Sequence, residues 1–195
     1  MSLSEKDILK IFEKSNALLR GHFKLTSGRH SDVYFQCAKV LQYPEYTEQL
    51  CSIITEKFKN YHIDTVLSPA IGGLVVGQEV SRQLNKKFIF AERETYDLIL
   101  RRGFSITEGE KILICEDVIT TGGSVFELID IVKSNNADVA GIGFIVDRSN
   151  GNISFDSPQI STIKLDVKSY TPADCPYCKE GLELVKHGSR KIIAS

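Results

Sequence analysis

The sequence predicts an α/β domain built on a central, mainly parallel sheet that is flanked by helices. Between residues 44 and 147, short apolar segments alternate with longer segments whose apolar residues recur at helical spacing. This alternation is typical of βαβ units, in which crossover helices cover the faces of a parallel sheet. The chain has 195 residues, 42% of them hydrophobic and 25% charged, as expected for one soluble domain with a single core.

The individual elements follow from these patterns. Strands are predicted over residues 32–37, 64–69, 87–92, 111–117, 138–147 and 161–167, and helices over 4–20, 44–60, 73–85 and 123–136. The second helix begins at Pro44, a favourable residue in a first turn, and its apolar residues lie along one face. Residues 93–110 are polar and charged apart from one short apolar run, which predicts a hairpin or a mobile excursion.

The two ends of the chain lie outside the alternating pattern. We expect a single domain over residues 1–195, with a core over about 44–150 and a small hood formed from about 1–40 and 155–195. The N-terminal stretch is amphipathic and lacks the unbroken apolar run of a signal peptide, which favours a cytoplasmic protein. The apolar residues that predict its helix are Ile8, Leu9, Ile11, Phe12, Leu18 and Leu19.

Charge and hydropathy exclude several classes of function. Lys and Arg number 24 and Asp and Glu number 25, so the net charge of −1 gives no reason to expect bulk binding of nucleic acid or an anionic membrane. No apolar run approaches the roughly 20 residues that span a bilayer.

Five cysteines, an odd number without a signal peptide, argue against a disulfide framework. Cys175 and Cys178 form a lone CPYC motif, whereas a structural zinc site normally needs two further ligands. No second cysteine pair follows, and His187 alone would not complete a site. The favoured interpretation is therefore a tight proline-containing turn, with metal binding as the minor alternative.

The segment "ILICEDVITTGGS" at residues 112–124 carries most of the functional signal. A buried strand runs into Glu116 and Asp117, and a helix is predicted to start near Gly123. The backbone N–H groups of a helix N-terminus attract an anion, and the nearby hydroxyls and glycines suit a phosphate that approaches the backbone closely. The residues of this phosphate half are Thr120, Thr121, Gly122, Gly123 and Ser124.

The two acids must face a different part of the ligand, because carboxylates repel phosphate. They can accept hydrogen bonds from neighbouring sugar hydroxyls or hold Mg²⁺ directly or through water. A ribose 5-phosphate satisfies both halves of the loop. The alternative is a purely structural role, in which Thr121 or Ser124 merely caps the helix and the acids form a solvated strand end.

At this point the loop resembles the motif by which type I phosphoribosyltransferases bind 5-phosphoribosyl 1-diphosphate (PRPP). Further segments resemble orotate phosphoribosyltransferases and cover nearly the whole chain. They are "GHFKLTSGRHSDVYFQ" (21–36), "SPAIGG" (68–73), "AERE" (91–94), "LRRGF" (100–104), "FIVDRSNG" (144–151) and "CPYCKEGLELVKHGSR" (175–190). The resemblance implies the type I phosphoribosyltransferase fold.

The resemblance also implies roles for individual residues. PRPP would be bound by Arg93, Glu116, Asp117, Val118, Ile119, Thr120, Thr121, Gly122, Gly123, Ser124, Gly72 and Gly73, and orotate by Thr120, Arg148, Tyr34 and Phe35. Arg101, Arg102 and Asp117 would be the catalytic residues. An arginine that follows an apolar strand suits the carboxylate of orotate, although Arg148 could also be a surface residue paired with Asp147.

The implied reaction joins PRPP and orotate into orotidine 5′-monophosphate and diphosphate, a step of pyrimidine nucleotide synthesis. The implied cofactor is Mg²⁺, held by PRPP and water rather than directly by the protein. A mobile loop over about 94–108 would reach into the neighbouring subunit of a homodimer. A purine phosphoribosyltransferase and a PRPP-sensing regulator of the same fold are the alternatives.

The chain departs from the better-known bacterial enzymes at three positions. Those enzymes carry lysines where this chain has Thr26, Gly72 and Glu94. We expect Arg101 and Arg102 to supply the missing positive charge, because a guanidinium binds phosphate bidentately. The alternative is that Arg101 and Arg102 belong to a solvent-exposed basic loop that does not contact the substrate.

Overall fold

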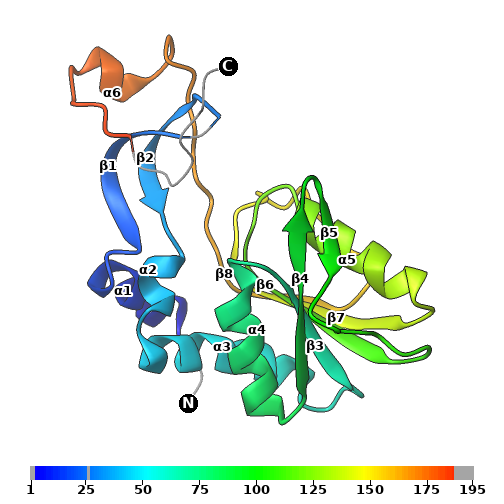
Figure 1. Cartoon of the computed structure of the whole chain (residues 1–195). Helices are drawn as coiled ribbons and strands as arrows, with labels where there is room; N and C mark the ends of the chain where they lie inside the picture. Colours follow the sequence, from blue (N-terminus) through cyan, green and yellow to red (C-terminus); the bar gives the residue numbers. More distant parts are fainter. Residues whose placement is uncertain (1–2, 26, 187–195) are drawn as a thin grey trace.

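The computed structural model describes residues 3–25 and 27–186 (Figure 1). Its main body is a six-stranded sheet in the order β5-β4-β3-β6-β7-β8, parallel throughout except for the edge strand β5. The strands are β3 (Thr65–Pro69), β4 (Lys87–Glu94), β5 (Asp97–Leu100), β6 (Lys111–Ile119), β7 (Asp138–Asp147) and β8 (Gln159–Lys164). The expected mainly parallel sheet is confirmed.

Helices cover both faces of this sheet. They are α1 (Glu5–Lys14), α2 (Ala38–Leu41), α3 (Pro44–Phe58), α4 (Gly73–Leu84) and α5 (Gly123–Ser134). No helix in the described ranges is long and apolar enough to cross a membrane.

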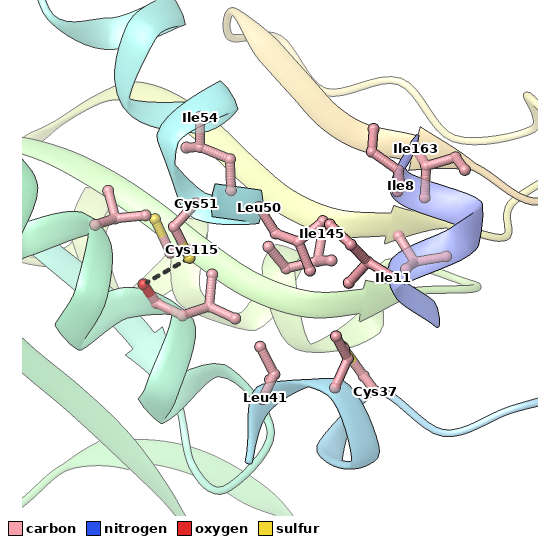
Figure 2. Close-up of a cluster of buried hydrophobic side chains, with 14 of the residues drawn as sticks. Ile8, Ile11, Cys37, Leu41, Leu50, Cys51, Ile54, Cys115, Ile145 and Ile163 are labelled. Atoms are coloured by element: carbon pink, nitrogen blue, oxygen red, sulfur yellow. Dashed lines mark hydrogen bonds between the residues drawn. The ribbon is translucent and has the colours of Figure 1, made fainter. Parts of the chain in front are cut away.

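Strand β6 shows how the sequence builds two cores. Its alternate residues Leu113 and Cys115 pack into a cluster with α1, α3 and α4, whereas Ile112 and Ile114 pack into a second cluster with α5. The period of two along a strand sends successive side chains to opposite faces of the sheet. Figure 2 shows the first cluster, in which Cys51 of α3 lies against Cys115 and its thiol contacts the carbonyl of Val76 at 3.9 Å.

The N-terminal helix is shorter than predicted. The expectation of a helix over 4–20 is wrong beyond Lys14, because the chain turns through Asn16 at φ 53° and enters strand β1 (Leu18–Lys24). A capping box between Ser4 and Asp7 fixes the start of α1. Leu18 fits helical spacing by coincidence; it is a buried strand residue that faces Phe35 of strand β2 (His30–Phe35).

Of the two alternatives for residues 93–110, a hairpin or a mobile excursion, the structure shows a hairpin for the first part, up to residue 100. Strand β4 continues to Glu94 and pairs antiparallel with β5, with Glu94 facing Asp97 across the turn. The remaining residues of the segment, 101–110, connect β5 back to the central strand β6.

A second, smaller unit stands beside the sheet (Figure 1). Its two strands, β1 and β2, pair antiparallel, and the C-terminal segment bridges to both of them, Tyr170 to His30 and Val185 to Phe23. We call β1, β2 and residues 165–186 the hood. Its C-terminal part begins later than the predicted 155, because β8 belongs to the main sheet.

The CPYC motif opens the short helix α6 (Pro176–Lys179) of the hood. The motif does not stand alone in the fold: His22 of β1 and His30 of β2, each about 150 residues away in the sequence, lie against Cys175 and Cys178. His187, the histidine considered earlier, lies outside the described residues.

Candidate active site

The acid–threonine–glycine loop forms a pocket at the carboxyl end of β6. Gly122 takes the left-handed conformation (φ 73°) and is the N-cap of α5, and no side chain caps this end. The alternative that Thr121 or Ser124 only caps the helix is therefore wrong. A cavity of about 240 Å³ is lined by Glu116, residues 118–125 and Glu127. Uncapped N–H groups at the positive end of a helix make it suitable for a phosphate.

Glu116 and Asp117 lie directly against the glycine turn before α4. A Cβ atom on Gly72 would come within 2.7 Å of the Asp117 carboxylate, and one on Gly73 within 3.2 Å of the Glu116 carboxylate. The structure thus brings together two loops that are separated by about forty residues of sequence. A side chain at Gly72 would displace the Asp117 carboxylate, and one at Gly73 would first meet Pro69 and the backbone carbonyl of Cys115, at 2.8 and 3.0 Å.

Burial keeps Glu116 neutral. Its side chain is only 7% exposed, and burial together with the adjacent Asp117 raises the pKa of Glu116 to about 9. The carboxyl oxygen accepts a hydrogen bond from the Asp117 backbone N–H at 3.0 Å. In the free protein Glu116 can therefore donate a hydrogen bond through its protonated oxygen, and the oxygens of both acids can accept hydrogen bonds. This combination suits sugar hydroxyls, which both donate and accept.

Arg148 lies at the end of β7, next to this loop. Its backbone N–H donates to the carbonyl of Ile119 at 2.9 Å, so the arginine follows β7 at the same edge where β6 ends. Its Nε atom is buried and has no hydrogen-bond partner. Burial lowers the pKa of Arg148, and nearby Tyr34 of β2 partly offsets this effect. An unsatisfied buried donor of this kind is costly unless a ligand supplies an acceptor.

The alternative that Arg148 is a surface residue paired with Asp147 is wrong. The Asp147 carboxylate instead accepts hydrogen bonds from the backbone N–H and the hydroxyl of Ser149, at 2.8 and 2.6 Å. The side chain of Phe35, the fourth orotate candidate, is 5% exposed and packs against Phe12 with ring centroids 5.0 Å apart. The Phe35 side chain is thus part of the core, and a contact with orotate through its backbone stays a prediction.

The predicted basic residues near β4 and β5 are each held by an acid. Arg93 makes a bidentate pair with Glu127 at 3.0 and 2.8 Å. Because Glu127 lines the pocket, this pair sets Arg93 at its rim. Sequence reasoning missed Glu127, although it lies four residues after Gly123 and hence on the same face of α5.

Arg101 and Arg102 lie in the turn after β5 and do not line this pocket. Arg101 is 3.5 Å from Glu94, and Arg102 makes two contacts of 2.8 Å with Glu92. The Arg102 guanidinium also lies 5.8 Å from the ring centre of Phe90. These pairs are exposed to solvent and so contribute little stability.

The three positions that lack the family lysines have different surroundings. Gly72 has no room for a side chain unless Asp117 moves, and Glu94 is paired with Arg101. Thr26 lies outside the described residues.

Comparisons with known proteins place this site in a family. The profile of the phosphoribosyl transferase domain matches residues 40–173. An orotate phosphoribosyltransferase of Caldanaerobacter subterraneus subsp. tengcongensis is 52% identical over 97% of this chain and all of its own length. One of Chlorobaculum parvum is 55% identical over 96% of this chain and 97% of its own.

Solved structures agree with the fold. The crystal structure of orotate phosphoribosyltransferase from Aeropyrum pernix superimposes with a TM-score of 0.69 at 24% identity and covers 81% of this chain and 93% of that one. The pocket at the end of β6, the neighbouring glycine turn and the full-length relatives lead to one conclusion: this chain belongs to the phosphoribosyltransferase family and is an enzyme of its orotate phosphoribosyltransferase group.

Proposed function

We propose that the enzyme transfers the 5-phosphoribosyl group of PRPP to orotate, giving orotidine 5′-monophosphate and diphosphate. The observation that carries orotate as the acceptor is the buried, unpartnered Nε of Arg148 beside Tyr34. The orotate carboxylate would supply the missing acceptor. The arginine stands next to the loop that would hold the ribose, so the base and the sugar can meet.

The phosphate of PRPP would occupy the pocket formed by residues 120–124 and the N-terminus of α5. The hydroxyls of Thr120, Thr121 and Ser124 and the free N–H groups would donate to it. Glu116 and Asp117 would then face the ribose hydroxyls. These contacts fix the sugar, so that its C1 faces the orotate nitrogen.

No side-chain nucleophile is needed for this transfer. As diphosphate leaves C1, positive charge develops on the ribose, and the Asp117 carboxylate would stabilise that charge. Arg93 at the pocket rim and Arg102 beyond it would neutralise the departing diphosphate. To reach it, Arg102 must exchange Glu92 for phosphate oxygens, an exchange of one exposed ion pair for a stronger one.

The residues present fit a magnesium ion that arrives with PRPP. Glu116 and Asp117 carry oxygen donors of the kind that Mg²⁺ prefers, and a cation that arrived with PRPP would favour the ionised form of Glu116. When bound, Mg²⁺ neutralises charge on the diphosphate.

The first test is a magnesium-dependent assay with PRPP and orotate that follows the loss of orotate absorbance. Turnover of orotate, with adenine, guanine and xanthine inert as acceptors, is the expected result. Turnover of a purine instead would overturn the assignment of Arg148.

A substitution sharpens this test. Arg148→Gln should raise the KM for orotate by about tenfold or more and leave the KM for PRPP near its original value, because a charged hydrogen bond contributes about 1.5–3 kcal/mol. Arg82→Gln is the matched control, since Arg82 pairs with Glu48 and Glu79 on the outer surface. Equal KM values for orotate in the two variants would contradict the proposal.

We also propose that the enzyme is a cytoplasmic homodimer whose hairpin after β4 completes the partner's site. Tyr96, at the tip of this hairpin, is 83% exposed, which is unusual for a large aromatic side chain. None of the five cysteines forms a disulfide, which suits a reducing compartment.

Mixing two inactive variants tests the shared site. If Arg102→Ala and Asp117→Asn protomers exchange, each heterodimer has one intact site and one doubly defective site, so activity should return to about a quarter of that of the original enzyme. No recovery despite verified subunit exchange would show that each site is built from one chain.

A further inference from the structure

Four potential metal ligands converge in the hood, and none of them lines the pocket at the end of β6. They are His22, His30, Cys175 and Cys178, and their ligand atoms all lie within 4.8 Å of one another. Three of the four residues are buried. The cluster takes no part in the chemistry proposed above.

Two local features of the backbone bring these side chains together. A bulge between Arg20 and Phe23 interrupts the pairing of β1 and β2, and His22 lies within it. Such bulges redirect a side chain that a regular strand would point elsewhere. On the other strand, the backbone of His30 exchanges hydrogen bonds of 2.9 and 2.8 Å with Tyr170, which holds the C-terminal segment across β2.

The separations match a tetrahedral metal site with two nitrogen and two sulfur ligands. The nitrogens of the two histidines are 3.1 Å apart, and the sulfur–nitrogen distances are 3.2, 3.4 and 3.6 Å. With Zn–N bonds of about 2.0 Å and Zn–S bonds of about 2.3 Å, the edges of such a tetrahedron are about 3.3–3.7 Å long.

Hydrogen bonds alone do not account for this arrangement. Nδ1 of His22 lies 3.0 Å from the carbonyl of Leu182, and because a carbonyl only accepts, Nδ1 must carry a proton. In the neutral ring, Nε2 then carries a lone pair and can only accept hydrogen bonds. Three atoms lie close to it: Nδ1 of His30 and the sulfur atoms of Cys175 and Cys178. One lone pair cannot serve three neighbours, whereas one central cation serves all four ligands. The bond to Leu182 is also the kind of outer contact that orients a metal-bound histidine.

The C-terminal part of the hood needs such a centre because it buries almost no apolar side chains. Of residues 164–186, only Cys175 is buried. Helix α6 has a single turn and contributes no other buried side chain. Small units that cannot bury enough apolar surface commonly depend on a structural metal.

We propose that His22, His30, Cys175 and Cys178 bind one structural Zn²⁺ ion. Four protein ligands close the coordination sphere, so the ion has no open position for a substrate. It joins β1, β2 and α6, and so fixes the C-terminal segment onto the strand that carries Tyr34 toward Arg148.

The zinc content of the whole, untagged enzyme tests the proposal without reference to activity. Elemental analysis should give about one zinc per chain. Cys178→Ser should lower this content by about tenfold or more, since one of four ligands is lost. Cys178 is exposed, so this variant places little demand on the packing of the core.

Two control variants separate loss of the site from a general effect of substitution. His62→Ala changes an exposed histidine, with a side chain 76% exposed, and Cys51→Ala changes a buried core cysteine. Both should keep the original zinc content. A zinc content equal in Cys178→Ser and in the original enzyme would overturn the proposed ligand set.

A spectroscopic experiment on the original sequence does not depend on any variant. The chelated enzyme is reduced and titrated with Co²⁺, which should give the visible bands of a tetrahedral ion and the charge-transfer band of cobalt–thiolate bonds. Hydrogen exchange in residues 18–35 and 165–186 should slow when the metal is restored. Octahedral cobalt without thiolate bands, or a Cys175–Cys178 disulfide in the freshly isolated enzyme, would refute the site.

Discussion

Replacing Glu116 by glutamine tests the protonation of the buried acid at the end of β6. The side chain is 7% exposed, and burial beside Asp117 raises its pKa from an ordinary 4.5 to about 9. Glutamine has nearly the same shape as the protonated acid, can accept the same hydrogen bond from the Asp117 N–H, and carries no proton to lose.

The direction of the effect follows from proton linkage. Between pH 4.5 and about 9 the unfolded chain has released this proton, whereas the folded chain still holds it. The unfolded state therefore binds fewer protons, and the stability of the original enzyme falls as the pH rises through this window. Below pH 4.5 both states are protonated and the penalty disappears.

The size of the effect follows from the same shift. One pKa unit corresponds to about 1.4 kcal/mol, so from pH 5 to pH 7.5 the original enzyme should lose about 3 kcal/mol relative to Glu116→Gln. For a chain of 150–250 residues this corresponds to about 6–12 °C in Tm.

Thermal unfolding of both proteins between pH 5 and pH 9, without substrates, measures the difference. The Tm of Glu116→Gln should exceed the Tm of the original enzyme by a difference that increases steadily with pH. Glu56→Gln is the control, because the Glu56 side chain is 68% exposed and its replacement should change Tm little at any pH. Parallel profiles for Glu116→Gln and the original enzyme would refute the idea of a buried neutral acid.

Three further substitutions test the site and its support. Arg102→Ala should lower kcat by one to about three decades with an unchanged Tm, because Arg102 supplies charge to the transition state; unchanged steady-state turnover would sink that role. Gly72→Ala should raise the KM for PRPP by about tenfold, because its Cβ would lie 2.7 Å from a carboxylate oxygen of Asp117 and displace that group. A KM for PRPP within twofold of the original value would argue against a contact between Asp117 and the ribose. Gly143→Ala should destabilise the fold by about 1–3 kcal/mol in urea titrations, because its Cβ would lie 2.3 Å from Cγ2 of the fully buried Ile54, and an unchanged midpoint would show that α3 shifts without cost.

Local patterns in the sequence were enough to predict the sheet and the phosphate loop. Short apolar segments indicate buried strands, so the five parallel strands of the main sheet were located to within a few positions, whereas β5 was predicted only as part of a possible hairpin. The pocket residues from Glu116 to Ser124 are contiguous, and their chemistry is readable because one turn brings them together. The N-terminal helix shows the limit: Leu18 matched the helical period, but pairing with β2 decided its structure.

Contacts between distant segments had to come from the tertiary structure. The neutral state of Glu116 depends on burial under α4 and beside the glycine turn, and the position of Arg148 near Tyr34 depends on how the hood stands against the sheet. The histidine–cysteine cluster is the clearest case. The CPYC motif was interpreted as a turn because only two potential ligands were visible in the sequence. A bulge in β1 and the crossing of the C-terminal segment over β2 bring two histidines to them. Spacing along a chain reports only on neighbours within an element, whereas ligands that meet from separate strands are brought together by the fold as a whole.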